Sequence, residues 1–292
     1  MRRIDCLVCG EDSHTVLDNE GRHGLKITNV SCNGCGFVFA NPQLDEEENK
    51  AFYELLYRAF FHGADESLDI NSYIQNQLLK GEKIYSNLEK YDILRNKNIK
   101  IFDIGCSAGG ILRFFKEKGF QNIYGIEPHK KLAKYAVNDL GLNVKQGFID
   151  DLEIEKYDLI IMRDVLEHLL DPNKGLRRIR KLCHRDTILY IDTNNLWVPL
   201  HAWKKYNYHF HFAHPYTFSI ISLTNILNKN GFSFQLIDGG RNIIGVAKKS
   251  NSLNKHNIQK EDARSIQKFI KKHNLVYPII RLKRKIRKNI PI

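Results

Sequence analysis

Short apolar runs alternate with segments of helical periodicity over residues 99–247 of this 292-residue chain. The runs are rich in β-branched residues and several end at an acidic residue, as buried parallel strands do. The segments between them repeat apolar residues every three or four positions, which indicates helices that cover a sheet. Strands are expected at 99–103, 122–126, 143–146, 157–162, 187–192, 232–237 and 242–247. The pattern therefore predicts an α/β fold.

Helical segments flank this region. Residues 46–95 are expected to pack against the sheet, which we favour over a second interpretation, a lid over a ligand site. The aromatic residues of such a lid would be Phe52, Tyr53, Tyr57, Phe60 and Phe61. After a polar linker, the pattern predicts a helix over 262–273, a break at Tyr277-Pro278, and a final basic amphipathic helix. Its apolar stripe would consist of Ile279, Leu282, Ile286 and Ile290.

The first apolar run leads into a turn of small residues, in which Asp103 is followed by Gly105, Ser107 and Gly109. Glycine permits backbone angles and close approaches that side chains block, which indicates a cofactor turn. Glu127 lies about twenty residues beyond the glycines, where an acid is placed to bind ribose hydroxyls. An acid within the turn would repel a pyrophosphate. It suits a ligand that carries an amino group and a sulfonium.

Three segments resemble the motifs of class I S-adenosylmethionine-dependent methyltransferases: residues 103–109, residues 125–128 and residues 158–168. Ser107 stands where many members have glycine. The resemblance covers residues 99–248 and implies a Rossmann-like seven-stranded sheet with helices on both faces, closed by a hairpin.

The resemblance also implies the cofactor site. Asp103 would lie near the methionine amino group, Glu127 would bind both ribose hydroxyls, and the loop after residue 146 would flank the adenine. A solvated acidic turn is the alternative for that loop. The expected cofactor-binding residues are Asp103, Gly105, Ser107, Gly109, Glu127, Pro128, Phe148, Ile149, Asp150 and Arg163.

Two Cys-x-x-Cys-Gly sequences precede the α/β region, with cysteines at positions 6, 9, 32 and 35. Each can present two thiolates from a tight turn, and four sulfurs complete a closed tetrahedral shell. We expect Cys6, Cys9, Cys32 and Cys35 to bind a structural zinc in a small ribbon.

A ribbon before such a domain resembles bacterial methyltransferases that modify sugars and surface polysaccharides. The expected organisation is a zinc ribbon (1–45), a helical lid or linker (46–98), a class I methyltransferase domain (99–248), and a linker with basic amphipathic helices (249–292). The resemblance implies methyl transfer to a small or glycosidic acceptor, with a sugar hydroxyl in surface-glycan biosynthesis favoured.

Three residues are candidates for catalysis: His168, Asp164 and His214. His168 follows a strand end that should face the site, and imidazole titrates near neutral pH, so it is the first choice of general base. Asp164 would orient it, and His214 is favoured among the reserve histidines of the aromatic insertion at 193–217. Two other interpretations of His168 stay open: a hydrogen-bonded core histidine, and a ligand to a divalent ion shared with Asp164 and Glu167, as in some O-methyltransferases.

The formal charge of +12 is concentrated at the C-terminus, where residues 263–292 contain ten basic residues and no acid. This tail favours contact with an anionic membrane surface. A solvated helix packed on a partner subunit is the alternative. No apolar run approaches the length of a transmembrane helix, so the protein is expected to be cytoplasmic, with peripheral binding at the inner face of the membrane. An RNA methyltransferase is a disfavoured alternative, because the sequence motifs of base methylation are absent. Another alternative is a non-catalytic protein that uses a cofactor-binding fold as a scaffold, with the ribbon and the tail binding partner proteins.

Overall fold

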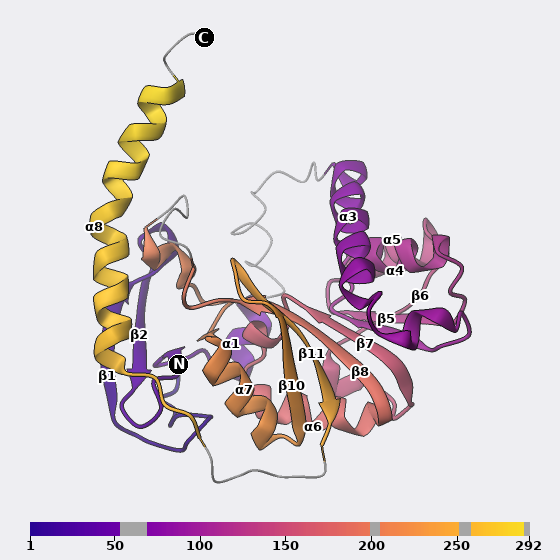
Figure 1. Cartoon of the computed structure of the whole chain (residues 1–292), viewed down its shortest axis with the longest axis horizontal. Coiled ribbons are helices and arrows are strands. Elements are labelled where there is room, and N and C mark those ends of the chain that lie inside the picture. The colour runs from indigo at the N-terminus through magenta and orange to yellow at the C-terminus, as the bar shows by residue number, and fades with distance from the viewer. Residues whose placement is uncertain (53–68, 199–204, 251–257, 289–292) are drawn as a thin grey trace.

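The computed structural model describes residues 1–52, 69–198, 205–250 and 258–288, the last ten of these through their backbone alone. A seven-stranded sheet with the order β10-β11-β8-β7-β4-β5-β6 forms its centre (Figure 1). The strands from β4 to β8 run parallel, and β11 runs antiparallel to β8 and β10. The seven strands of this sheet are β4 (Ile101–Ile104), β5 (Ile123–Glu127), β6 (Asn143–Gln146), β7 (Tyr157–Arg163), β8 (Cys183–Asn194), β10 (Phe232–Asp238) and β11 (Asn242–Lys249). The predicted α/β fold and sheet are confirmed.

Alternate residues of each central strand face opposite layers of helices. Ile101 and Ile161 pack with α3 (Ile70–Leu88), α4 (Gly110–Glu117) and α5 (Lys130–Asn138). Their strand neighbours, such as Ile160, pack with α6 (Pro172–Leu182) and α7 (Ile220–Lys229). Figure 1 shows the two sets of helices on either side of the sheet. Burial of both faces explains why these strands are continuously apolar.

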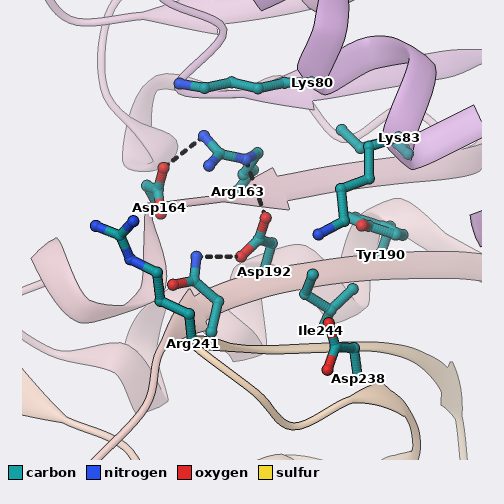
Figure 2. Close-up of a pocket in the computed structure, with 11 residues that line it drawn as sticks. Lys80, Lys83, Arg163, Asp164, Tyr190, Asp192, Asp238, Arg241 and Ile244 are labelled. Atoms are coloured by element: carbon teal, nitrogen blue, oxygen red, sulfur yellow. Dashed lines mark hydrogen bonds and ion pairs between the residues drawn. The ribbon is translucent and has the colours of Figure 1, made fainter. Parts of the chain in front are cut away.

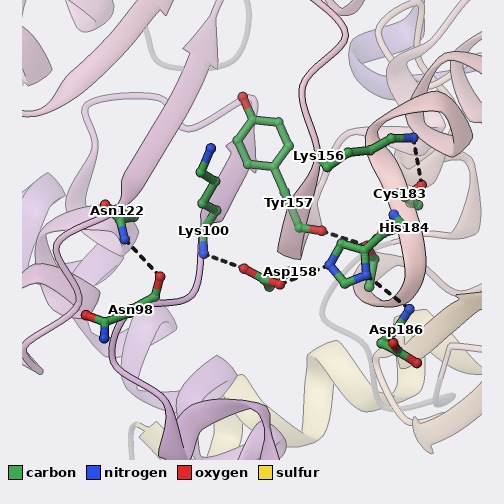
Figure 3. Close-up of polar contacts among 10 residues, drawn as sticks. Asn98, Lys100, Asn122, Lys156, Tyr157, Asp158, Cys183, His184 and Asp186 are labelled. Atoms are coloured by element: carbon green, nitrogen blue, oxygen red, sulfur yellow. Dashed lines mark hydrogen bonds and ion pairs between the residues drawn. The ribbon is translucent and has the colours of Figure 1, made fainter.

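Polar contacts join the amino ends of the central strands (Figure 3). The Asp158 carboxylate accepts a hydrogen bond from the backbone N–H of Lys100 (2.7 Å) and contacts His184 Nε2 (2.9 Å). Thr187 Oγ1 donates to the carbonyl of Tyr157 (2.6 Å). Hydrogen bonds between neighbouring strands therefore stabilise this end of the sheet. Ligand sites of such sheets lie beyond the opposite, carboxyl ends of the strands.

A second sheet, of order β1-β2-β3-β9, carries the cysteine turns. It consists of β1 (His14–Glu20), β2 (Lys26–Cys32), β3 (Val38–Ala40) and β9 (Tyr216–Thr217). Because β9 belongs to the aromatic insertion, a segment distant in sequence completes the N-terminal sheet. Phe37 and Phe39 extend the core of the α6–α7 face into this module.

The remaining elements are helical. They are α1 (Glu46–Ala51), α8 (Ala263–Lys288) and short 3-10 turns at Arg22–Gly24, Asp92–Arg95, Ile149–Asp151, Leu166–His168 and Tyr206–His209. Figure 1 shows α8 lying along β1 and β2 and extending past them. The predicted break at Tyr277-Pro278 is wrong, because α8 continues through Pro278. No helix in the described part of the chain is both long and apolar enough to span a membrane.

Two predictions lie partly outside the described residues. Of the lid aromatics, only Phe52 is described, where it is buried and contacts the ring of Phe212. The apolar stripe of the last helix belongs to residues whose side chains, or whose whole placement, the structure does not describe.

Candidate active site

The turn after β4 is held by three different elements. The backbone N–H of Gly105 donates to the carbonyl of Ile126 on β5 (2.8 Å). From α3, Tyr73 Oη contacts Ser107 Oγ (2.6 Å), and Gln77 Oε1 accepts the N–H of Gly110 (3.0 Å). Helix α3 therefore packs directly on the turn.

Both glycines of the turn adopt positive φ, +70° at Gly105 and +84° at Gly109. A Cβ on Gly105 would lie 2.9 Å from Val165 Cγ2, and one on Gly109 would lie 2.6 Å from Leu142 Cδ1. Glycine is thus required by backbone conformation and by contacts within the protein. We expected instead that the missing side chains would make room for the ligand. Ser107 also has positive φ (+53°), which a non-glycine residue adopts at a cost.

Asp103 lies one residue before the end of β4, with its side chain almost fully buried at 1% exposure. Its Oδ2 has no hydrogen-bond partner within the described residues. Burial raises the pKa of Asp103 to about 8, opposed by the charge of Arg163 and assisted by that of Glu127. A buried polar oxygen without a partner is costly unless a ligand supplies a donor. An ammonium group would supply both the donor and the opposite charge.

Glu127 ends β5 and lies beside the turn. Its Oε2 accepts the N–H of Ser107 (2.9 Å), and its Oε1 accepts the N–H of His129 (2.8 Å), one residue beyond the half-buried Pro128. Each carboxylate oxygen can accept more than one hydrogen bond. Glu127 therefore orders the turn and retains acceptor capacity for a ligand's hydroxyl groups.

The loop after β6 contains the three residues predicted to flank an adenine. Phe148 is exposed at 46%, whereas Ile149 is partly buried against the core. Asp150 forms an ion pair with Lys174 of α6 (2.7 Å). An exocyclic amine would share the Asp150 carboxylate with this lysine.

A cavity of about 420 Å³ opens beside the end of β7 (Figure 2). Arg163 lines it, forming ion pairs with Asp164 (2.5 Å) and with Asp192 of β8 (3.0 Å). Asp164 has positive φ (+53°), an unfavourable conformation that is often found at functional sites. Arg163 ends β7, which pairs with β4 so that Met162 lies opposite Ile104. The cavity and the turn after β4 therefore lie at the carboxyl ends of neighbouring strands.

Three side chains after β7 and in the insertion form a second cluster. Glu167, His168 and His214 each offer a ligand atom within 4.8 Å of the others. His168 Nε2 lies 3.0 Å from His214 Nε2, and the His211 ring lies beside that of His214 at 3.9 Å between centroids. Asp164 is absent from this group. The predicted group of metal ligands was Asp164, Glu167 and His168; in the structure, the third member of the group is His214 in place of Asp164.

Burial governs the protonation of this cluster. It lowers the pKa of His168 to about 4 and that of His214 well below its ordinary value. It raises the pKa of Glu167, which accepts a hydrogen bond from Thr193 Oγ1 (2.7 Å), to about 8. Two neutral imidazoles beside a carboxyl group can accept a proton or bind a divalent cation.

Comparison with known proteins identifies the family. A profile of the family described as "Methyltransferase domain" matches residues 75–236, more than half of the chain. The chain belongs to this methyltransferase family. Magnesium protoporphyrin IX methyltransferase from Synechocystis, solved with bound SAH, shares the fold with a TM-score of 0.50 at 18% identity, over 69% of this chain and 98% of that one. The prediction of an S-adenosylmethionine-dependent methyltransferase is confirmed.

Curated relatives are more similar in sequence but match shorter segments. A ubiquinone biosynthesis O-methyltransferase from Pelagibacter ubique is 28% identical over 192 residues, 57% of this chain and 73% of that protein. One from Actinobacillus pleuropneumoniae is 32% identical over 108 residues, 33% of this chain and 46% of that protein. The match to this chain thus covers less than half of the length of the Actinobacillus protein.

The N-terminal module of the methyltransferase brings its four cysteines together. The Sγ atoms of Cys6 and Cys35 lie 3.5 Å apart, those of Cys9 and Cys32 lie 3.4 Å apart, and all four lie within 4.8 Å. Sulfurs bound to one zinc at about 2.3 Å would be separated by roughly 3.8 Å. The geometry therefore fits a Cys₄ zinc site, which remains our proposal.

The cysteine module also supports the histidine cluster. The N–H of Ala40, at the end of β3, donates to the carbonyl of Pro215 (2.8 Å), directly after His214. Phe37, two residues beyond Cys35, stacks on Tyr216 with ring centroids 5.7 Å apart. The position of His214 thus depends on the module that the cysteines organise.

We expect purified methyltransferase to contain one zinc per chain and Cys32→Ser to lose it, because the thiolate shell would be incomplete. Metal analysis by mass spectrometry measures both. Cys183→Ser is the matched control, since Cys183 is buried outside the cluster and should leave the zinc content unchanged. Absence of zinc from the parent, or full occupancy in Cys32→Ser, would contradict the assignment.

Sequence reasoning missed the contribution of α3 to the site. Tyr73, Gln77 and Lys80 recur at helical spacing and contact the turn or line the cavity. Their spacing indicates one face of a helix, and this was the available signal. It does not indicate which part of the fold that face contacts.

Proposed function

We propose that this protein is an S-adenosylmethionine-dependent O-methyltransferase that acts on a small or glycosidic acceptor, favouring a sugar hydroxyl in surface-polysaccharide biosynthesis. The observation that carries the proposal is the polar cavity at the end of β7, the strand that pairs with β4; it is large enough for a small molecule and lined mainly by charged side chains. The curated relatives described above are named as O-methyltransferases, which supports transfer to oxygen. The sugar assignment rests on the resemblance of the ribbon-plus-domain arrangement to sugar methyltransferases.

The cofactor residues have distinct proposed roles. S-adenosylmethionine, when bound, supplies a methyl group already activated by its sulfonium. Asp103 binds the amino group, Glu127 binds the ribose hydroxyls, and the glycine turn shapes the backbone around them. Phe148, Ile149 and Asp150 contact the adenine, and Arg163 fixes the wall between cofactor and acceptor.

His168 is the proposed general base. Its imidazole is neutral at physiological pH because burial lowers its pKa to about 4, and the same burial makes it a weaker base than an exposed histidine. We propose that it accepts the hydroxyl proton as the methyl group is transferred. His214 contacts His168 and orients it, and Asp164 positions the acceptor at the cavity wall. A divalent ion held by Glu167, His168 and His214 is the alternative use of the same cluster.

The proposal is tested by transfer of a labelled methyl group to a panel of sugar nucleotides, lipid-linked glycans, dihydroxylated aromatics and structured RNA. Labelling of a sugar oxygen supports it. Labelling of RNA alone would replace it with the disfavoured alternative. Absence of S-adenosylhomocysteine binding in calorimetry would leave the scaffold interpretation.

The C-terminal helix is proposed to hold the protein at an anionic membrane surface on the cytoplasmic side. Ile266 and Ile270 of α8 pack against the N-terminal module, and Leu275 beyond them is 74% exposed. The first part of α8 is thus anchored, while the sequence after it is basic. Each basic residue near an anionic surface contributes about 1 kcal/mol.

We expect the full-length protein to float with vesicles that contain anionic lipid, and a chain ending at Asn274 to remain in solution. The truncation removes six of the ten basic residues of the tail while retaining the packed part of α8. Neutral vesicles provide the control, because the attraction is electrostatic. Equal flotation of the two proteins would show that the tail has another role, such as packing on a partner subunit.

A further inference from the structure

The cavity beside Arg163 has more cations than carboxylates in its lining. Its charged lining consists of Lys80, Lys83, Arg163, Arg241, Asp164, Asp192 and Asp238. Two of the three acids pair with Arg163, and Asn242 Nδ2 also donates to Asp192 (2.7 Å). Within the described residues, no ion pair joins Lys80, Lys83 or Arg241 to any acid. The lining therefore carries four cations against three carboxylates, and Asp238 is the one of these carboxylates that does not pair with Arg163.

Lys80 illustrates the energetic consequence. Its ammonium is partly buried, and burial together with the charge of Arg163 lowers its pKa, although Asp164 and Asp192 act in the opposite direction. A cation removed from water without a counter-charge is unfavourable. An anionic ligand would supply that charge and restore the hydrogen bonds lost from water.

The cations surround the cavity from two sides. Figure 2 shows Lys80 and Lys83 extending from the helix on one side and Arg241 from the hairpin on the other. They belong to α3 and to the turn between β10 and β11. Lysines act as point charges, and the planar guanidinium of arginine offers paired donors to carboxylate or phosphate oxygens.

The sheet order separates this cavity from the cofactor's ribose site. Glu127 ends β5, on one side of β4, whereas the cavity spans β7, β8 and β11 on the other side of β4. The methyl acceptor therefore has the cavity side of the sheet available to it.

We propose that the cavity binds an anionic group of the methyl acceptor, a phosphate or a carboxylate, through Lys80, Lys83 and Arg241. This inference rests on the methyltransferase function proposed above. A glycosyl phosphate combines a sugar hydroxyl with such a charge, and therefore fits both the proposed reaction and the cavity.

The test is titration calorimetry on full-length protein saturated with S-adenosylhomocysteine, with inorganic pyrophosphate and malonate as probes of the two anion chemistries. One probe is expected to bind with one-to-one stoichiometry and with an affinity that falls as salt is added. Lys80→Gln, Lys83→Gln and Arg241→Gln should each weaken binding at least tenfold. Lys248→Gln removes the same charge from the opposite end of β11 and should have no effect.

Absence of binding by both probes, or equal binding by the parent and the three cavity variants, would overturn the inference. If, in addition, Lys80→Gln lost affinity for S-adenosylhomocysteine, the cations would instead bind the carboxylate of the cofactor. Failure of the parent to bind S-adenosylhomocysteine would refute the proposed function itself, which is a separate result.

Discussion

Replacing His168 with alanine is expected to lower turnover about a hundredfold or more and to leave the affinity for S-adenosylhomocysteine unchanged. Methyl transfer chiefly requires the acceptor oxygen, the methyl carbon and the sulfur to be aligned. A hydroxyl acceptor must also lose its proton as it attacks. His168 ends the 3-10 turn that follows β7 and is neutral at physiological pH, and its Nε2 contacts the imidazole of His214 (3.0 Å). The measurement is steady-state turnover of the acceptor identified by the screen, with cofactor binding measured by calorimetry.

His184→Ala is the matched control for this experiment. His184 contacts Asp158 (2.9 Å) at the amino ends of the strands (Figure 3). The candidate site lies at the opposite, carboxyl ends. Loss of His184 should leave turnover close to that of the parent. Near-normal turnover in His168→Ala would move the base to His214, or to His209 or His211 in the same insertion.

A chelator separates the base from the metal alternative. If Glu167, His168 and His214 hold a divalent ion, treatment with a chelator should abolish turnover while the zinc of the ribbon is retained. The closed Cys₄ shell should release its ion more slowly than a cluster of two imidazoles and one carboxylate. Unchanged turnover after chelation supports His168 as the base.

The elements that could be predicted from the sequence are those specified by local patterns. The strand at 143–146 was predicted with the bounds that the structure shows, because Gly141 and Gly147 mark turns on either side of it. The break at Pro278 was predicted by the same local logic and is wrong. Proline removes one backbone hydrogen bond and costs about 3 kcal/mol in a helix, yet α8 continues on both sides of it.

The candidate site could be predicted only where its residues follow strand ends. Asp103, Glu127 and Arg163 lie at the carboxyl ends of adjacent strands, and the sheet brings them together. The contact between His168 and His214 joins residues 46 positions apart. It depends on the pairing of β9 with β3, and β9 is a two-residue strand that has no periodicity to detect. The packing of α3 on the turn escaped prediction for the same reason, since a helical face does not specify its partner.

Replacing Asp103 with asparagine is expected to weaken S-adenosylmethionine binding by about 2 to 5 kcal/mol, roughly thirtyfold or more, because a buried carboxylate and an ammonium lose their pairing. The same change should stabilise the protein without ligand. Burial raises the pKa of Asp103 to about 8 from an ordinary value near 4. Between about pH 4 and pH 8 the folded protein keeps the Asp103 proton while the unfolded chain loses it, so the free energy of unfolding falls as the pH rises through this range. The asparagine side chain cannot ionise, so this decrease is absent from the variant.

Thermal unfolding of ligand-free parent and Asp103→Asn at pH 6 and pH 9 measures this difference. The gap in melting temperature should favour the variant and widen at the higher pH. Glu167, whose pKa burial also raises to about 8, contributes a pH dependence of the same sign in both proteins and therefore cancels in the comparison.

Calorimetry in buffers of different ionisation enthalpy adds a second measurement of the same carboxyl group. At pH 7 the parent should release a proton when S-adenosylmethionine binds, because the ammonium stabilises ionised Asp103, and the variant should not. The stability gain and the binding loss would then share one cause, the desolvated carboxyl group at the end of β4. Parent-like binding by Asp103→Asn, with the same proton release, would show that the amino group is bound elsewhere.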